Sequence, residues 1–166
     1  RPRRRAGSSA SFRETATFPT PDLGACGRDL ALDGLGPRKG TVRLAVAGVG
    51  SFARRRALPA IAASTRCETA VLVAQPRERV SDVAETYGVD HVVEYENFHE
   101  GTCTDAYDAL YIAAPNAVHG EYATTAAAFG KDVLCEKPLE ITSERAQEVV
   151  ETCEDAGITL MTAYRL

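Results

Sequence analysis

A glycine-rich turn and a lysine are the parts of this sequence best suited to chemistry. The turn spells G-x-G-x-x-A at 48–53 and directly follows the apolar run Val42–Ala47. Lys137 follows a later apolar run and precedes a proline. Glycine-rich turns that open a helix bind phosphates, and a lysine beside a hydroxyl group is suited to relay a proton. The two features together predict nucleotide-dependent chemistry.

Each small residue of the turn has a separate role in dinucleotide binding. Gly48 permits the tight turn, Gly50 lets a pyrophosphate approach the backbone, and Ala53 lets helix and strand pack closely. The phosphates would meet the amides at the start of the helix. The alternative is a glycine-rich strand–helix connection without a ligand. We expect a cofactor to contact Gly48, Gly50, Ser51, Phe52 and Ala53.

The residues after the second predicted strand distinguish NADP from NAD. An acid there would bind the ribose hydroxyl of NAD and repel the 2′-phosphate of NADP. The sequence instead has Ala74, Gln75 and Arg77, and no acid before Glu78. An arginine binds phosphate through charge-assisted hydrogen bonds. We expect NADP rather than NAD; alternatively, Arg77 is a solvated residue at a helix start.

These residues would lie on a sheet of alternating strands and helices. Buried strands are predicted at 42–47, 70–74, 91–93, 109–113, 132–136 and 158–163. Amphipathic helices are predicted at 53–63, 80–87 and 118–129, and from a cap at Thr142 or Ser143 to a stop at Gly157. This alternation predicts an α/β fold, a Rossmann-type doubly wound parallel six-stranded sheet.

Two further clusters follow the fourth and fifth predicted strands, where such sheets bind ligands. The first contains Ala114, Pro115, Asn116 and His119, and the second is the segment 135–139 around Lys137. Alone, Asn116 is typical of a helix cap, His119 of a hydrogen-bonded core or surface residue, and Lys137 of a solvated loop. Their shared position beside the expected nicotinamide site favours a functional role.

From Val42 to Leu166 the sequence resembles the glucose–fructose oxidoreductase/inositol dehydrogenase/rhizopine-catabolism (Gfo/Idh/MocA) family. The resemblance is carried by GVGSFA, AAPNAVH, CEKP and TLMTAYR. Within the family it looks most similar to glucose–fructose oxidoreductase and the D-xylose 1-dehydrogenases of salt-loving archaea, which use NADP. The resemblance implies a second, antiparallel-sheet domain that would follow Leu166 and is absent from this chain.

The same resemblance implies roles for individual residues. Lys137 would be the catalytic lysine at the substrate hydroxyl, supported by Glu136. Pro115, Asn116 and His119 would line the nicotinamide end of the cofactor, and Tyr164 and Arg165 would lie near the cofactor pocket. The remaining expected cofactor contacts are Ala74, Gln75, Arg77, Ala114, Glu136 and Lys137.

The leading functional hypothesis is therefore an NADP-dependent oxidation of the C1 hydroxyl of an aldose. Two alternatives stay open: a dinucleotide-binding module without catalysis, and a family member that acts on another polyol such as inositol. The sequence does not select the sugar, because the residues that would do so belong to the second domain. Without that domain we expect this chain to be inactive alone, and the full-length protein could form a homo-oligomer.

Composition and charge narrow the remaining possibilities. Residues 1–40 are rich in Arg, Pro, Gly and Ser without a sustained period, so we expect a disordered basic arm before a nucleotide-binding domain at 41–166. Residues 1–66 hold 13 Lys and Arg against 4 acids, and residues 67–166 hold 6 against 19. The acidic, lysine-poor body suggests a halophile. No nucleic-acid motif and no membrane-length apolar run is present.

Five cysteines without a C-x-x-C pair fit neither a zinc site nor a disulfide framework, so we expect no metal. Unpaired thiols are typical of a reducing compartment, which favours the cytoplasm.

Overall fold

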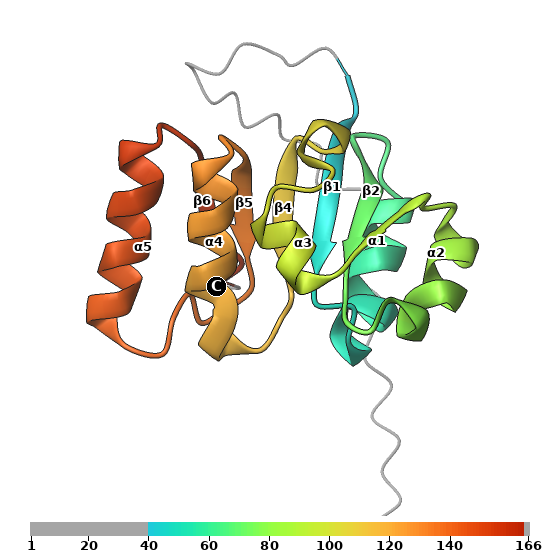
Figure 1. The fold of residues 1–166 in the computed structure, drawn as a ribbon, viewed down its shortest axis with the longest axis horizontal. Coiled ribbons are helices and arrows are strands. Elements are labelled where there is room, and N and C mark those ends of the chain that lie inside the picture. The colour runs from blue at the N-terminus through green and yellow to red at the C-terminus, as the bar shows by residue number, and fades with distance from the viewer. Residues whose placement is uncertain (1–39, 165–166) are drawn as a thin grey trace, which may run out of the picture. The chain divides into compact units, whose positions relative to one another are not determined.

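The computed structural model describes residues 40–164. Of the expected basic arm at 1–40, only Gly40 is among the described residues. Arg165, an expected cofactor contact, also lies outside them. Within the described part, six strands form one parallel sheet in the order β3-β2-β1-β4-β5-β6 (Figure 1). This order confirms the predicted doubly wound Rossmann-type sheet.

The strands are built from the apolar runs that the sequence predicted, with different ends. β1 is strongly buried because a parallel sheet is covered on both faces, and its last four residues are all buried. β2 begins three residues earlier than expected, whereas β6 is only three residues long. The bounds are β1 Val42–Ala47, β2 Cys67–Val73, β3 His91–Val93, β4 Ala109–Ile112, β5 Asp132–Cys135 and β6 Leu160–Thr162.

The helices follow the predicted pattern with one addition. Thr142 caps the last helix by accepting a hydrogen bond from the amide of Arg145, and Gly88 ends another in the left-handed region. The added element is α3. The α-helices are α1 Leu58–Ala62, α2 Ser81–Tyr87, α3 Tyr95–His99, α4 His119–Ala128 and α5 Ser143–Asp155. None of these described helices has the length and apolar character needed to cross a membrane.

The helix after the glycine-rich turn contains a wide π-helical segment, η2 (Ala53–Ala57). The amide of Leu58 donates to the carbonyl of Ala53, five residues back. Pro59 lies in the first turn of α1. Because it has no amide hydrogen to donate, a proline fits the first turn of an α-helix but not its interior. The proline therefore marks the point where the wide segment ends and α1 begins.

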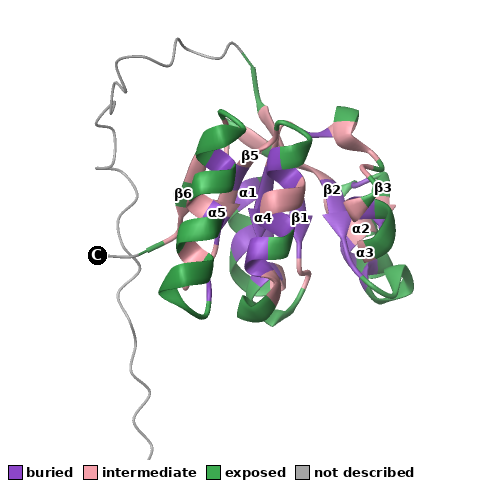
Figure 2. Ribbon diagram, turned by 60° about the vertical axis from the view of Figure 1, so that its left-hand side comes forward, coloured by how far each residue is buried: buried purple, intermediate pink, exposed green. Residues whose placement is uncertain are grey.

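Two apolar layers lie on opposite faces of the sheet (Figure 2). One layer joins strand residues such as Ala45 and Ile112 to α3, α4 and α5. The other joins Val46 and Leu72 to the helix at 53–62 and to α2. Both layers bury the centre of the sheet, which fixes the carboxyl ends of β1, β4 and β5 at one edge.

Candidate functional site

The chain reverses its direction of winding between β1 and β4, which are neighbours in the sheet although β2 and β3 come between them in sequence. Ligands of open α/β sheets bind outside the carboxyl ends of the strands at such a point. Gly48 lies there with φ +88°, and a Cβ atom on it would be 2.5 Å from the Cα atom of Ala114. Only glycine fits this close approach between the turn and the end of β4.

The rest of the turn leaves room for a ligand. A Cβ atom on Gly50 would meet no atom within 4 Å, and Ser51 and Phe52 are exposed. Ala53 is fully buried against the sheet. The amide of Arg54 donates to the carbonyl of Gly50, so the preceding amides lie at the helix start, where no earlier helical carbonyl can accept from them. These observations fit the phosphates of a dinucleotide.

The end of β2 carries no carboxylate near the expected ribose position. Ala74 is buried and its amide donates to the carbonyl of Val93. Gln75 and Arg77 are exposed, and Arg77 borders a cavity of about 320 Å³ beside β3. Within residues 40–164 the guanidinium groups of Arg77 and Arg79 make no hydrogen bond or ion pair. Both groups are therefore available to an anion.

Arg54, which the sequence analysis did not single out, connects the turn to the segment after β2. Its guanidinium donates to the carbonyl oxygens of Val49 and Arg79 and pairs with Asp82, where Nη1 lies 2.6 Å from Oδ2. The hydrogen bond from Arg54 lowers the pKa of the Asp82 carboxyl. Because its donors are engaged within the protein, Arg54 holds the two segments together, leaving Arg77 and Arg79 as the free arginines there.

Glu136 and Lys137 follow β5 at the same edge. The hydroxyl of Tyr111 donates to Oε1 of Glu136 at 2.7 Å, and burial followed by this hydrogen bond raises the pKa of Tyr111. The amide of Glu136 donates to the carbonyl of Ile112, which fixes the start of the loop. Lys137 is exposed, and its ammonium group has no partner among residues 40–164. It is therefore free to meet a substrate.

The segment after β4 divides into exposed and buried parts. Pro115 and Asn116 are exposed, and Ala114 is half-buried beside Gly48. His119 has no exposed surface, and its ring nitrogens lie 2.8 Å and 2.9 Å from the carbonyl oxygens of Pro138 and Ala114. A ring so enclosed presents nothing to a ligand, so we revise the expectation that His119 contacts the cofactor. Tyr164, which the family resemblance placed near the cofactor pocket, is 63% exposed.

Glu140 is a buried carboxylate that the sequence analysis missed, because acidic residues are seldom fully buried. Oε1 accepts hydrogen bonds from the amide of Gly120 at 3.2 Å and from Arg145 at 3.0 Å, and Oε2 accepts from the amide of Ile141. Gly120 allows this approach, since a Cβ atom on it would lie 2.7 Å from Oε1. Glu140 thus fastens the loop after β5 to α4 and α5.

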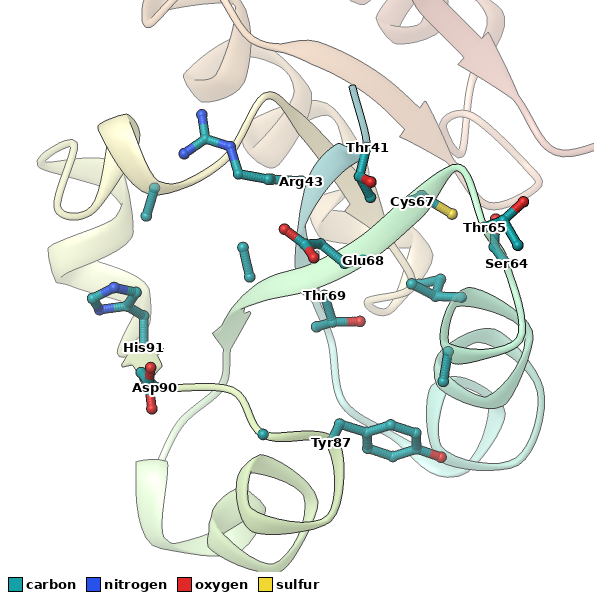
Figure 3. Close-up of a pocket in the computed structure, with 15 residues that line it drawn as sticks. Thr41, Arg43, Ser64, Thr65, Cys67, Glu68, Thr69, Tyr87, Asp90 and His91 are labelled. Atoms are coloured by element: carbon teal, nitrogen blue, oxygen red, sulfur yellow. The ribbon is translucent and has the colours of Figure 1, made fainter. Parts of the chain in front are cut away.

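A cavity of about 690 Å³ in the described part lies elsewhere (Figure 3). Its lining includes Arg43, Glu68, Tyr87 and His91, at or near the amino ends of β1, β2 and β3. None of the residues predicted for the cofactor or for catalysis lines it. We therefore take the carboxyl ends of the strands as the candidate site, because the glycine-rich turn and Lys137 lie there.

The sheet order, the glycine-rich turn and the residues after β4 and β5 define a dinucleotide-binding domain of the Rossmann type. The chain belongs to the Gfo/Idh/MocA family, whose model, described as an oxidoreductase family with an NAD-binding Rossmann fold, matches residues 42–164.

Relatives named as sugar or polyol dehydrogenases match much of this chain. The chain is 50% identical over 126 residues to the D-xylose 1-dehydrogenase [NADP(+)] of Haloarcula marismortui and 36% identical over 121 residues to the D-xylose 1-dehydrogenase (NADP(+)) 2 of Haloferax volcanii. The matches cover 75% and 73% of this chain and 35% of each relative. It is also 34% identical over 88 residues to a scyllo-inositol 2-dehydrogenase (NADP(+)) of Bacillus subtilis, covering 53% of this chain and 26% of that protein. The chain thus spans about a third of the relatives' length.

Solved structures show the same arrangement. An aldose-aldose oxidoreductase from Caulobacter crescentus, complexed with glycerol, superposes with a TM-score of 0.70 at 31% identity, over 75% of this chain and 38% of that one. A 3-ketoreductase from Actinomadura kijaniata, in complex with NADP and TDP-benzene, gives 0.69 at 31% identity, over 75% and 37%.

Proposed function

We propose that residues 41–166 are the dinucleotide-binding domain of an NADP-dependent oxidoreductase that acts on the C1 hydroxyl of an aldose. The observation that carries the proposal is the shared edge of the sheet: the Gly48 turn contacts Ala114, and unpaired Lys137 follows the neighbouring strand. The relatives from Haloarcula and Haloferax, named as NADP-dependent D-xylose dehydrogenases, support the substrate class.

The cofactor would be held by groups that the chain already presents. The turn around Gly50 and the amides at 51–53 would bind the pyrophosphate, and Arg77 would bind the 2′-phosphate. Ala114, Pro115 and Asn116 would line the nicotinamide end. When bound, NADP⁺ supplies the acceptor for the hydride that leaves C1 of the sugar.

Lys137 would act on the substrate hydroxyl. In its neutral form the amine would take the C1 hydroxyl proton at Nζ while the C1 hydrogen leaves as hydride, so the sugar loses two electrons and two hydrogens. Glu136 would support this position, because its carboxylate is fixed by the Tyr111 hydroxyl and borders Lys137 in the chain. The sugar's other hydroxyls would be recognised by groups outside the described residues.

Two outcomes separate this proposal from its alternatives. Titration with NADP⁺ and NAD⁺ tests which cofactor binds. The reaction is tested with a form of the protein that turns over substrate, which should oxidise D-xylose or D-glucose with NADP⁺ but should not oxidise scyllo-inositol. Oxidation of inositol instead would move the substrate to another polyol. Tight NADP binding without oxidation of any of these would favour a binding module.

A further inference from the structure

Arg54 connects three segments of the chain through its guanidinium group, an arrangement that we call the Arg54 clamp. Nε donates to the carbonyl oxygen of Val49 at 3.3 Å, inside the glycine-rich turn after β1. Nη2 donates to the carbonyl oxygen of Arg79, inside the short turn η3 (Arg77–Val80) after β2. Nη1 lies 2.6 Å from Oδ2 of Asp82, near the start of α2. One planar group therefore fixes the turn after β1 relative to the turn after β2.

These two turns are the places where a dinucleotide meets a fold of this type. The pyrophosphate binds at the glycine-rich turn, and the ribose of the adenosine half lies at the end of the second strand. In the proposed function, the 2′-phosphate of NADP lies beside Arg77, two residues before the carbonyl that Arg54 holds. NADP would therefore place phosphates on both turns, whereas NAD would place phosphates on the first turn only.

The turn η3 benefits from an external support because little of it is buried. Arg77, Glu78 and Arg79 are exposed, and only Val80 of this turn is buried. Ordering one exposed, flexible side chain when a ligand binds lowers affinity by about two- to tenfold. A turn that is already fixed before the ligand arrives avoids part of this loss.

Arg54 itself is poorly placed to bind the additional phosphate. Its side chain is 33% exposed, and its three nitrogen atoms already donate to groups within the protein. To reach a ligand it would have to leave Asp82, whose carboxylate also repels a phosphate. The contacts therefore favour a role in which Arg54 acts through the turn that it holds.

We propose that Arg54 is a positioning residue for cofactor choice: by tying Val49 to Arg79 it holds Arg77 where the 2′-phosphate binds, and so favours NADP over NAD. Its role in cofactor choice rests on the proposed function, whereas the Arg54 clamp itself belongs to the cofactor-free chain. The two can therefore be tested separately.

Arg54→Lys tests the role in cofactor choice while the positive charge is retained. A lysine has one nitrogen, so it cannot replace the fork of donors that reaches Val49, Arg79 and Asp82. The matched control is Arg56→Lys, because Arg56 is exposed and makes no hydrogen bond or ion pair among residues 40–164. In calorimetric titrations Arg54→Lys should bind NADP⁺ about fivefold more weakly and NAD⁺ within about twofold of the parent, and the control should match the parent. Unchanged NADP⁺ binding, or equal weakening of both dinucleotides, would refute this role.

A second background distinguishes positioning from direct contact with the phosphate. In a chain that carries Arg77→Ala and Arg79→Ala, neither free arginine of η3 remains to be positioned. Arg54→Lys should then change NADP⁺ affinity by less than about twofold. A loss of about fivefold in this background as well would mean that Arg54 binds the phosphate itself, which would overturn the proposal.

Amide hydrogen exchange in the cofactor-free chain tests the Arg54 clamp without a ligand. The amide of Arg79 donates to the carbonyl of Pro76, and the amide of Val118 donates to the carbonyl of Pro115 in the corresponding turn after β4. Arg54→Lys should speed exchange at Arg79 by about fivefold and leave Val118 unchanged. Unchanged exchange at Arg79 would show that the clamp does not hold the turn. If the parent binds no NADP⁺ while Arg54→Lys speeds this exchange, the proposed function and the role in cofactor choice fail, and the clamp stands.

Discussion

Gly48 and Ala114 meet backbone to backbone: a Cβ atom on the glycine would lie 2.5 Å from both the Cα and the amide nitrogen of Ala114. The contact joins the end of β1 to the end of β4, where the winding of the sheet changes direction. Any side chain at 48 would push these ends apart, and its backbone would also be strained at φ +88°.

Gly48→Ala and Gly50→Ala should therefore have different effects. The first should destabilise the fold by about 2–4 kcal/mol, combining backbone strain with the backbone clash. The second should change stability by less than about 1 kcal/mol, because a Cβ atom at 50 meets only open space. It should nevertheless weaken NADP binding, since the methyl group would occupy the approach of the pyrophosphate. Urea unfolding and calorimetric titration of both variants measure the two effects. Equal loss of stability in the two would contradict this account.

Arg77 is expected to determine the preference for NADP. Its guanidinium has no partner among the described residues, so Arg77→Ala should weaken NADP binding by about tenfold or more while NAD binding changes little. Arg79→Ala is the matched control on the same turn, η3 (Arg77–Val80). The measurement is the ratio of the two dissociation constants. If Arg79→Ala removes the preference for NADP and Arg77→Ala does not, the phosphate contact belongs to Arg79.

Lys137→Ala should abolish sugar oxidation and leave NADP affinity within about threefold of the parent, because binding rests mainly on the turn and Arg77. Lys131→Ala supplies the control: Lys131 donates to the carbonyl of Tyr107 and precedes β5 at the opposite end of the strand. Steady-state rates of sugar oxidation, measured with a form of the protein that turns over substrate, report the effects of both substitutions. Substantial turnover by Lys137→Ala would remove it from the catalytic role.

The Arg43–Asp108 pair should make stability depend on pH. The side-chain hydrogen bond from Arg43, and then the bond from its backbone amide, lower the pKa of Asp108. A lowered folded-state pKa contributes stability above the unfolded value of about 4, and this is lost as pH falls through the folded-state value. Urea unfolding at several pH values should show parent and Asp108→Asn converging at acidic pH. A constant difference throughout would show that the pair does not titrate with folding.

The sheet was predictable because its strands are continuous apolar runs, and the glycine-rich turn because glycine and alanine occupy fixed positions after β1. The wide helical segment before Pro59 and the short α3 were not predicted. α3 depends on tertiary contacts, including Phe98 against Tyr122 at 5.4 Å between ring centroids, which no local pattern shows.

The positions of the candidate site residues follow from the strand order, whereas their roles stay predictions. Gly50, Arg77 and Lys137 are exposed and follow the carboxyl ends of β1, β2 and β5. His119 shares the segment with exposed Asn116, but its ring turns inward to the Pro138 carbonyl, nineteen residues away in sequence. Sequence position along one loop does not reveal which of its side chains is buried.

Calorimetric titration of this chain with NADP⁺ and, in parallel, NAD⁺ tests the central claim most directly. The account predicts saturable binding of NADP⁺ that is at least about tenfold tighter than that of NAD⁺, the contribution of one phosphate–arginine contact. Circular dichroism of the same sample reports whether it is folded. A folded chain that binds neither dinucleotide, or prefers NAD⁺, would contradict the account.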